Sequence, residues 1–139
     1  MTTATLTKLT KIVVDRPAPK PDGMNLWIDL DINLSKSTAL IHSRAEEFVG
    51  THKDRKVTFR ADHDCWLSFT NPDVFDLKSV NLTSPVQLTE FVQVVLPIKD
   101  TTTNATTYYE IYIGAPPLEA VEPMQETVVP RGGPHIVVP

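Results

Sequence analysis

The sequence predicts an all-β sandwich, and three observations support this fold class. Segments with apolar residues at every second position recur through the first 115 residues, and turn-forming residues separate them. Side chains alternate between the two faces of a strand, so each such segment indicates a strand with one buried face. Helical segments do not alternate with these strands, which argues against an α/β sheet. We expect about seven to nine strands and at most one short helix.

Length and composition narrow the class further. A chain of 139 residues fits one domain, which at this size buries roughly 70% of its unfolded surface. The single cysteine excludes an internal disulfide, and the net charge of −4 comes without a block of like charge. No stretch approaches the roughly 18 apolar residues of a membrane span, and the first residues show no signal-peptide pattern. We therefore expect a soluble, cytoplasmic protein that has no cofactor. We also expect that this protein binds neither nucleic acid nor membranes.

Two strands and a connector are expected at the start of the chain. Residues 5–15 are rich in Thr, Ile and Val and predict a strand, best supported over 12–15. Alternate prolines in 17–23 favour an extended connector that ends in a tight turn. Residues 24–34 then alternate without interruption. They predict a long strand whose core face is formed by Met24, Leu26, Ile28, Leu30, Ile32 and Leu34.

Residues 35–50 allow two interpretations. Ser37 would cap a short helix whose apolar residues face the sheet. Glu46 and Glu47 near the end of that helix would oppose its dipole. The alternative is a strand over 38–43 followed by a loop, and we favour it.

The stretch Lys56–Phe75 organises the rest of the chain. Apart from His63, its odd positions are apolar up to Phe69, and its even positions are largely polar, which predicts two consecutive strands. The triplet Asp62-His63-Asp64 is expected to form the bend between them, and Asn71-Pro72-Asp73 the turn that follows. Trp66 interrupts the polar phase, so its indole is expected to be exposed or at an interface.

Further strands are expected up to residue 115. Residues 74–77 and 80–82 predict two short strands, and 88–97 predicts a strand buried on both faces. Residues 100–107 predict a hairpin-like loop, and 108–113 the last strand of the domain. Half of the twelve prolines lie in the final 24 residues. This shift divides the chain into a β-sandwich domain, 1–115, and a proline-rich extended arm, 116–139.

Residues 55–115 carry a family resemblance. The strand Lys56–Phe59, the polar bend and the strand Trp66–Phe69, followed by 89–94 and 108–112, resemble the strand order of the cupredoxin family of Greek-key sandwiches. An immunoglobulin-like sandwich fits the pattern nearly as well. In the cupredoxin family, Cys, a second His and Met cluster after the last strand. Residues 113–117 (Ile-Gly-Ala-Pro-Pro) hold no such ligand, so the resemblance implies the fold without the copper site.

Two sites for chemistry are conceivable. One is a metal site, because imidazole and carboxylate ligands suit several divalent ions. Its candidate ligands are His63, Asp62, Asp64, Asp29 and Asp31. The alternative, which we favour, is a turn beside a solvated strand face. The other is a Cys65 nucleophile with His63 as its base. Cys65 is in phase with apolar neighbours, however, so we expect a buried core thiol.

Contacts with a ligand or partner are expected at two places. Trp27 and Trp66 both lie in the polar phase of their strands and would form a binding patch if they were paired; two separate rings are the alternative. The arm carries two β-branched runs that suit addition to a sheet edge, in the same molecule or a neighbour. Its expected contact residues are Val128, Val129, Ile136, Val137 and Val138, unless the arm is disordered.

These features predict a non-catalytic structural or interaction module that self-associates through its arm, so that its partner is a protein or a second copy. The alternative is a carbohydrate- or small-ligand-binding domain that uses an exposed Trp. A metal-dependent enzyme around His63 ranks third.

Overall fold

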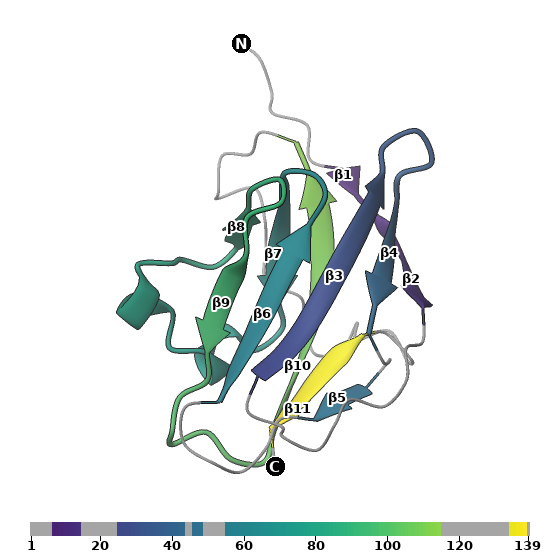
Figure 1. Ribbon diagram of the computed structural model, residues 1–139. Coiled ribbons are helices and arrows are strands. Elements are labelled where there is room, and N and C mark those ends of the chain that lie inside the picture. Colours follow the sequence, from purple (N-terminus) through teal and green to yellow (C-terminus); the bar gives the residue numbers. More distant parts are fainter. Residues whose placement is uncertain (1–6, 15–24, 44–45, 49–54, 115–133, 139) are drawn as a thin grey trace.

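Two β-sheets pack face to face in the computed structural model (Figure 1). The structure describes residues 7–14, 25–43, 46–48, 55–114 and 134–138. One sheet, here the β3 sheet, runs in the order β2 (Thr10–Val14), β4 (Thr38–His42), β3 (Asn25–Asn33), β6 (Lys56–Ala61) and β9 (Val94–Pro97). The other, the β10 sheet, runs in the order β5 (Glu46–Phe48), β11 (His135–Val138), β10 (Ala105–Ile113), β7 (Cys65–Phe69) and β8 (Val86–Leu88), and β1 (Thr7–Lys8) also pairs with β10.

The predicted all-β sandwich is confirmed. Eleven strands are present in the described part of the chain, more than the seven to nine expected. Two expected strands are each divided between the sheets, two others are absent, and two strands are additional: β5, where a loop was expected, and β11, in the expected arm. No helix among the described residues is long and apolar enough to cross a membrane.

The long strand β3 has the predicted phase. Leu26, Ile28 and Leu30 are buried, while the residues between them are exposed. Ile32 is only half-buried, and Leu34 is exposed because it lies beyond the end of β3 in the turn to β4. β3 pairs antiparallel with β4 and parallel with β6, so it is the middle strand of its sheet. The strand interpretation of 38–43 is thereby confirmed over the helix.

Aromatic rings join the two sheets at the centre of the core. Phe59 of β6 contacts Tyr109 of β10 with ring centroids 5.4 Å apart and Phe69 of β7 at 6.1 Å. Phe75 packs on Phe69 at 4.9 Å, and these three contacts are edge-to-face, the arrangement that aromatic quadrupoles favour. The predicted strands at 56–61 and 65–69 and the bend at 62–64 therefore build the core as expected.

The short strands expected at 74–77 and 80–82 were wrong. The chain forms two 3-10 helices instead, η1 (Pro72–Val74) and η2 (Leu77–Val80), where at most one short helix was expected. Pro72 at the start of η1 fixes a helical φ, and Asn81 ends η2 in the left-handed conformation at φ 57°. Residues 74–77 make only an isolated bridge, between Phe75 and Ile98, and 80–82 pair with no strand among the described residues, so neither stretch builds a ladder.

The single strand expected over 88–97 was also wrong, because the chain changes sheets there. β8 ends at Leu88 in the β10 sheet, and β9 begins at Val94 in the β3 sheet. The turn between them places Phe91 at φ 59° and is held by the Glu90 N–H, which donates to Asp64 Oδ1 at 2.8 Å. Phe91 is consequently exposed rather than buried on both sides.

The first expected strand is divided in the same way. The Leu9 N–H donates to the carbonyl of Ile111 in the β10 sheet at 2.8 Å, and the Thr10 N–H donates to the carbonyl of Ser37 beside β4 at 2.9 Å. The chain therefore crosses from one sheet to the other at Leu9, which is buried.

The end of the expected arm is a strand of the sandwich. β11 lies between β10, to which it is antiparallel, and β5, to which it is parallel (Figure 1). Ile136 and Val138 are completely buried, so they belong to the core. β11 therefore packs as part of the sandwich, although its residues were expected to lie in the arm, 116–139. Val128 and Val129 lie outside the described residues.

Candidate functional site

The outer face of the β3 sheet, the side turned away from the β10 sheet, carries an exposed tryptophan. Trp27 projects from the middle strand and is 39% exposed. Its cross-strand neighbour on β6 is Thr58, whose own neighbour on β9 is Val95. Thr58 lies at an outward position of β6 but is buried. Trp27, Thr58 and Val95 thus form one row across three strands.

The next row carries charge. Asp29 of β3 lies opposite His42 of β4 on one side and Arg60 of β6 on the other. His42 Nε2 is also 2.6 Å from Asp31 Oδ2, two positions along β3. The Arg60 guanidinium lies over the ring of Phe91, 5.5 Å from its centroid, which is a cation–π contact.

Two adjoining depressions lie on this face. The first has a volume of about 400 Å³ and is lined by Asp29, Leu30, Asp31, His42, Arg60, Ala61, Asp62 and Phe91. The second, of about 650 Å³, shares Asp31 and Asp62 with the first and is otherwise lined largely by the apolar residues Ile12, Ile32, Leu34 and Leu40 and by polar residues of the β3–β4 turn. A charged hollow therefore continues into a more apolar one.

Exposed apolar side chains are gathered on this side of the molecule. Of the eight large ones that are exposed among the described residues, seven belong to strands of the β3 sheet or to turns at their ends: Ile12, Val14, Trp27, Leu34, Phe91, Val92 and Val95. The eighth, Val80, lies in η2. The two outer faces of the sandwich are therefore unequal in apolar exposure.

The five candidate metal ligands do not converge. Asp62 Oδ1 accepts from the Ile32 N–H at 2.8 Å, Asp64 Oδ1 accepts from the Glu90 N–H, and His63 Nδ1 lies 2.9 Å from the Asp64 carbonyl. These side chains shape the bend and the turns around it, as the alternative to a metal site predicted. Asp29 and Asp31 do share the outer face of β3. Nowhere in the described ranges do three His, Cys, Asp or Glu side chains form a group that could hold a metal ion.

The two tryptophans do not form one patch. Trp66 lies on β7 of the β10 sheet, between the buried positions Cys65 and Leu67, so it faces away from the β3 sheet. Its indole N–H donates to the Gly114 carbonyl at 3.3 Å, and the ring is half-buried. Trp27 faces outward on the opposite side of the sandwich. Only Trp27 therefore belongs to the surface that carries the exposed apolar residues.

Cys65 is a buried core thiol, as predicted. It is 1% exposed, and burial, together with the negative charges of Asp62 and Asp64, raises its pKa to about 12. The nucleophilic form of cysteine is the thiolate, which this environment suppresses at neutral pH. The nucleophile hypothesis is therefore not supported.

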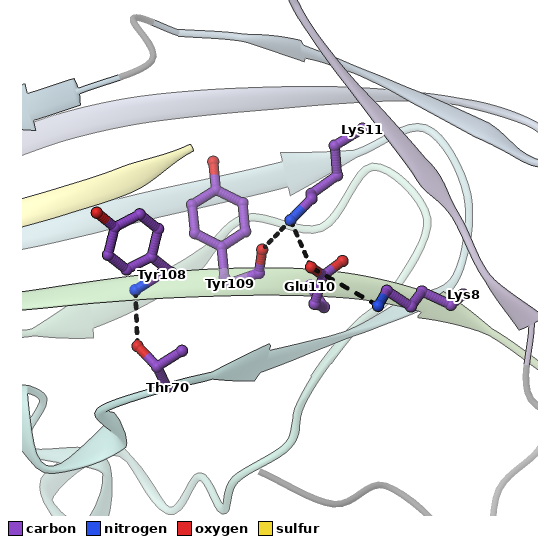
Figure 2. A network of polar contacts seen from close by, with 6 residues as sticks. All are labelled: Lys8, Lys11, Thr70, Tyr108, Tyr109 and Glu110. Atoms are coloured by element: carbon purple, nitrogen blue, oxygen red, sulfur yellow. Dashed lines mark hydrogen bonds and ion pairs between the residues drawn. The ribbon is translucent and has the colours of Figure 1, made fainter. Parts of the chain in front are cut away.

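A polar network that the sequence did not indicate joins the two sheets (Figure 2). Lys11 Nζ donates to Glu110 Oε1 at 2.7 Å and to the Tyr109 carbonyl at 3.0 Å, while Lys8 lies 3.9 Å from the same carboxylate oxygen. The Glu110 side chain is 3% exposed, so this is a buried ion pair. In the structure Lys11 points inward, and Ile12 and Val14 point outward.

The comparisons with known proteins give no identity. No protein-family model matches the chain, and no curated protein or solved structure matches it significantly.

Proposed function

We propose that the chain is a non-catalytic interaction module whose partner-binding surface is the outer face of the β3 sheet, centred on Trp27. The observation that carries this proposal is the one-sided distribution of exposed apolar residues. A large cluster of exposed apolar side chains on a folded domain often marks an interaction site, whereas single exposed apolar residues are common and need no explanation.

The residue types on this face support a protein partner. Trp and Arg are the side chains most enriched among residues that dominate binding energy, and aromatic residues and Arg are enriched at interfaces generally. Trp27, Arg60 and Phe91 supply these types, and Asp29 and Asp31 add polar groups beside them. A rigid sheet holds Trp27 in place, so little side-chain and backbone entropy is lost when a partner covers it.

A matched pair of valines tests the proposal. Val95 and Val80 are both 38% exposed, but only Val95 lies in the Trp27 row. A partner captured from an extract of the source organism is purified and titrated against wild-type protein, Trp27→Ala, Val95→Lys and Val80→Lys. Trp27→Ala should weaken binding about 30-fold or more, the loss typical of a dominant contact. Val95→Lys should weaken it as well, and Val80→Lys should not. Equal affinities for all four proteins would contradict the proposal.

A second candidate function is binding of a carbohydrate or another small ligand. It is favoured by the first depression, where the ring of Phe91 lies beside three carboxylates, an imidazole and a guanidinium. An aromatic surface with a few convergent polar groups is the usual make-up of a small-ligand site. A glycan array compared between wild-type protein and Phe91→Ala tests this candidate. Binding that Phe91→Ala leaves unchanged would argue against it.

The proposed self-association through the arm would occur by exchange of β11, in which the β11 strand of one copy adds to the sheet of another copy. An exchanged β11 would make the same ladders with β10 and β5, because the acceptor strands are identical in each copy. A sample prepared from equal parts of isotope-labelled and unlabelled chains, refolded together, tests this. Exchange predicts filtered NOEs between Val137 of one chain and Thr106 of the other, which are paired in register. Their absence in an oligomer of this protein would exclude exchange.

A further inference from the structure

The four strands that end the two sheets differ in how they are protected. β5 and β8 have three residues each, and a very short edge strand offers little to an added strand. β9 ends in Pro97, and the stretch just before η2 covers its end, since the Asp76 N–H donates to the Pro97 carbonyl and Phe75 bridges to Ile98. β2 has five residues, Thr-Lys-Ile-Val-Val, without proline or glycine, and in the described residues it pairs only with β4 within its sheet. β2 is therefore the least protected edge.

The one charged residue of β2 does not guard this edge. A lysine that projects into solvent normally discourages pairing at an edge strand. Lys11 instead points inward, and its ammonium group is bound by Glu110 and the Tyr109 carbonyl. The side chains that β2 exposes to solvent are those of Thr10, Ile12, which is 45% exposed, and Val14. The solvent-exposed side chains of this edge are thus uncharged and β-branched.

The backbone groups that face the free edge follow from the pairing with β4. The Thr10 N–H donates to the Ser37 carbonyl, and Thr10, Ile12 and Val14 lie in register with Thr38, Leu40 and His42. In a parallel ladder alternate residues bond to the same neighbour, and the residues between them point the other way. The N–H and C=O groups of Lys11 and Val13 therefore point away from β4, toward the free edge.

We propose that β2 pairs with β2 of a second copy, antiparallel about a two-fold axis at Ile12, so that the two five-stranded sheets become one continuous sheet. Lys11 then faces Val13 of the other copy, and each such pair exchanges two backbone hydrogen bonds. The two Ile12 residues face each other as a non-hydrogen-bonded pair, the type in which opposite side chains are closest. The sequence is self-complementary in this register, because β-branched side chains meet at the axis and no lysine faces a lysine.

This edge, with Ile12 and Val14, lies at the margin of the outer face of the β3 sheet and not at its centre at Trp27. Trp27 lies on the middle strand, two strands away from β2. Pairing at the edge therefore leaves Trp27 open, and the Trp27→Ala and Ile12 variants distinguish failure of one proposal from failure of the other. An interface made by one short strand is small, so we expect a reversible dimer rather than a permanent one.

A charge-complementation experiment tests the axis. Sedimentation equilibrium of the full chain from about 1 μM to about 1 mM should show the wild-type protein moving from monomer to dimer. Ile12→Lys and Ile12→Glu each place two like charges opposite each other at the axis, so each variant alone should bind itself about tenfold or more weaker. An equimolar mixture of the two should dimerise again. Val80→Lys, at an exposed residue (38%) in η2 outside the β3 sheet, and Trp27→Ala should leave the dimer unchanged.

A measurement on the wild-type protein serves as the second test. Amide exchange followed by NMR should show the Lys11 and Val13 amides exchanging more slowly as concentration rises, while the protection of Ile12 and Val14 changes little. Three results would each overturn the proposal: a monomer at all concentrations, a dimer that the Ile12 variants form as well as wild type does, or Lys11 and Val13 amides that do not respond. Failure of the Ile12→Lys and Ile12→Glu mixture to dimerise would overturn the two-fold register.

Discussion

The place of β11 in the core makes a quantitative prediction for Ile136→Ala. Ile136 is completely buried between β10 and β5, whereas the next residue, Val137, is half-buried on the other face of the same strand. Truncating a buried isoleucine to alanine costs about 2–5 kcal/mol, the sum of the lost transfer free energy and the cavity that remains. The whole domain is expected to have a free energy of unfolding of about 5–15 kcal/mol. Ile136→Ala should therefore remove a large part of it.

Urea denaturation of the full chain measures this loss, with Val137→Ala as the matched control. With an m value of about 2 kcal/mol/M, Ile136→Ala should lower the midpoint by about 1–2.5 M without changing m. Val137→Ala should lower the free energy of unfolding by about 1 kcal/mol or less. If the two variants were equally stable, β11 would not belong to the folded core, and the reasoning would be refuted.

Three further predictions concern the core. Ile28→Asp places an unpaired carboxylate at the centre of β3 and should prevent folding as judged by circular dichroism, while Asp29→Asn on the exposed face should melt near the wild-type temperature. Equal losses of stability in the two variants would mean that the phase of β3 is wrong. Lys11→Met leaves the Glu110 carboxylate buried without its partner and should lower the free energy of unfolding in urea by about 3–5 kcal/mol. Lys8→Met, at the exposed lysine 3.9 Å from that carboxylate, should lower it by about 1 kcal/mol or less, and a similar loss for both variants would refute the buried ion pair. The raised pKa of Cys65 means that the folded state holds the thiol proton more tightly than the unfolded state does, so this effect stabilises the protein fully below pH 9 and is lost between pH 9 and about 12. Cys65→Ala should therefore lose less stability than wild type over that pH range, and rapid labelling of the thiol in the native protein would contradict its burial.

Periodicity predicted the part of the fold in which one face of a strand is buried along its whole length. The alternation in β3, β6 and β7 gave both the strands and the buried residues, including Cys65. The bend at 62–64 was predictable because three consecutive polar residues cannot be buried in the core. In these segments local pattern and tertiary environment agree.

Periodicity failed where the chain changes sheets. A segment that leaves one sheet at Leu9 or Leu88 and enters the other soon afterwards appears in the sequence as one strand-forming segment, although each piece has its own partner strand. The phase of β2 was not predicted either. Lys11 faces inward because Glu110, 99 residues away, binds it, and nothing local to β2 indicates that partner.

The candidate site was predictable only in part. Trp27 and the carboxylates of β3 were identified because they lie in the polar phase of a clear strand. Arg60, Phe91 and Val95 were not identified, because their proximity to Trp27 depends on the register of β6 and β9 against β3. A cross-strand register cannot be read from a single sequence without the turns that fix it.

Hydroxyl-radical footprinting of the complex with the captured partner tests the proposed interaction surface most directly. Side chains covered by a partner are oxidised more slowly than in the free chain. Trp27 and Phe91 should become protected several-fold on binding, while Trp66, on the opposite face, and Val80 in η2 should keep their free rates. Protection of Trp66 with unchanged oxidation of Trp27 would place the partner on the other sheet and contradict the assignment of the outer face of the β3 sheet.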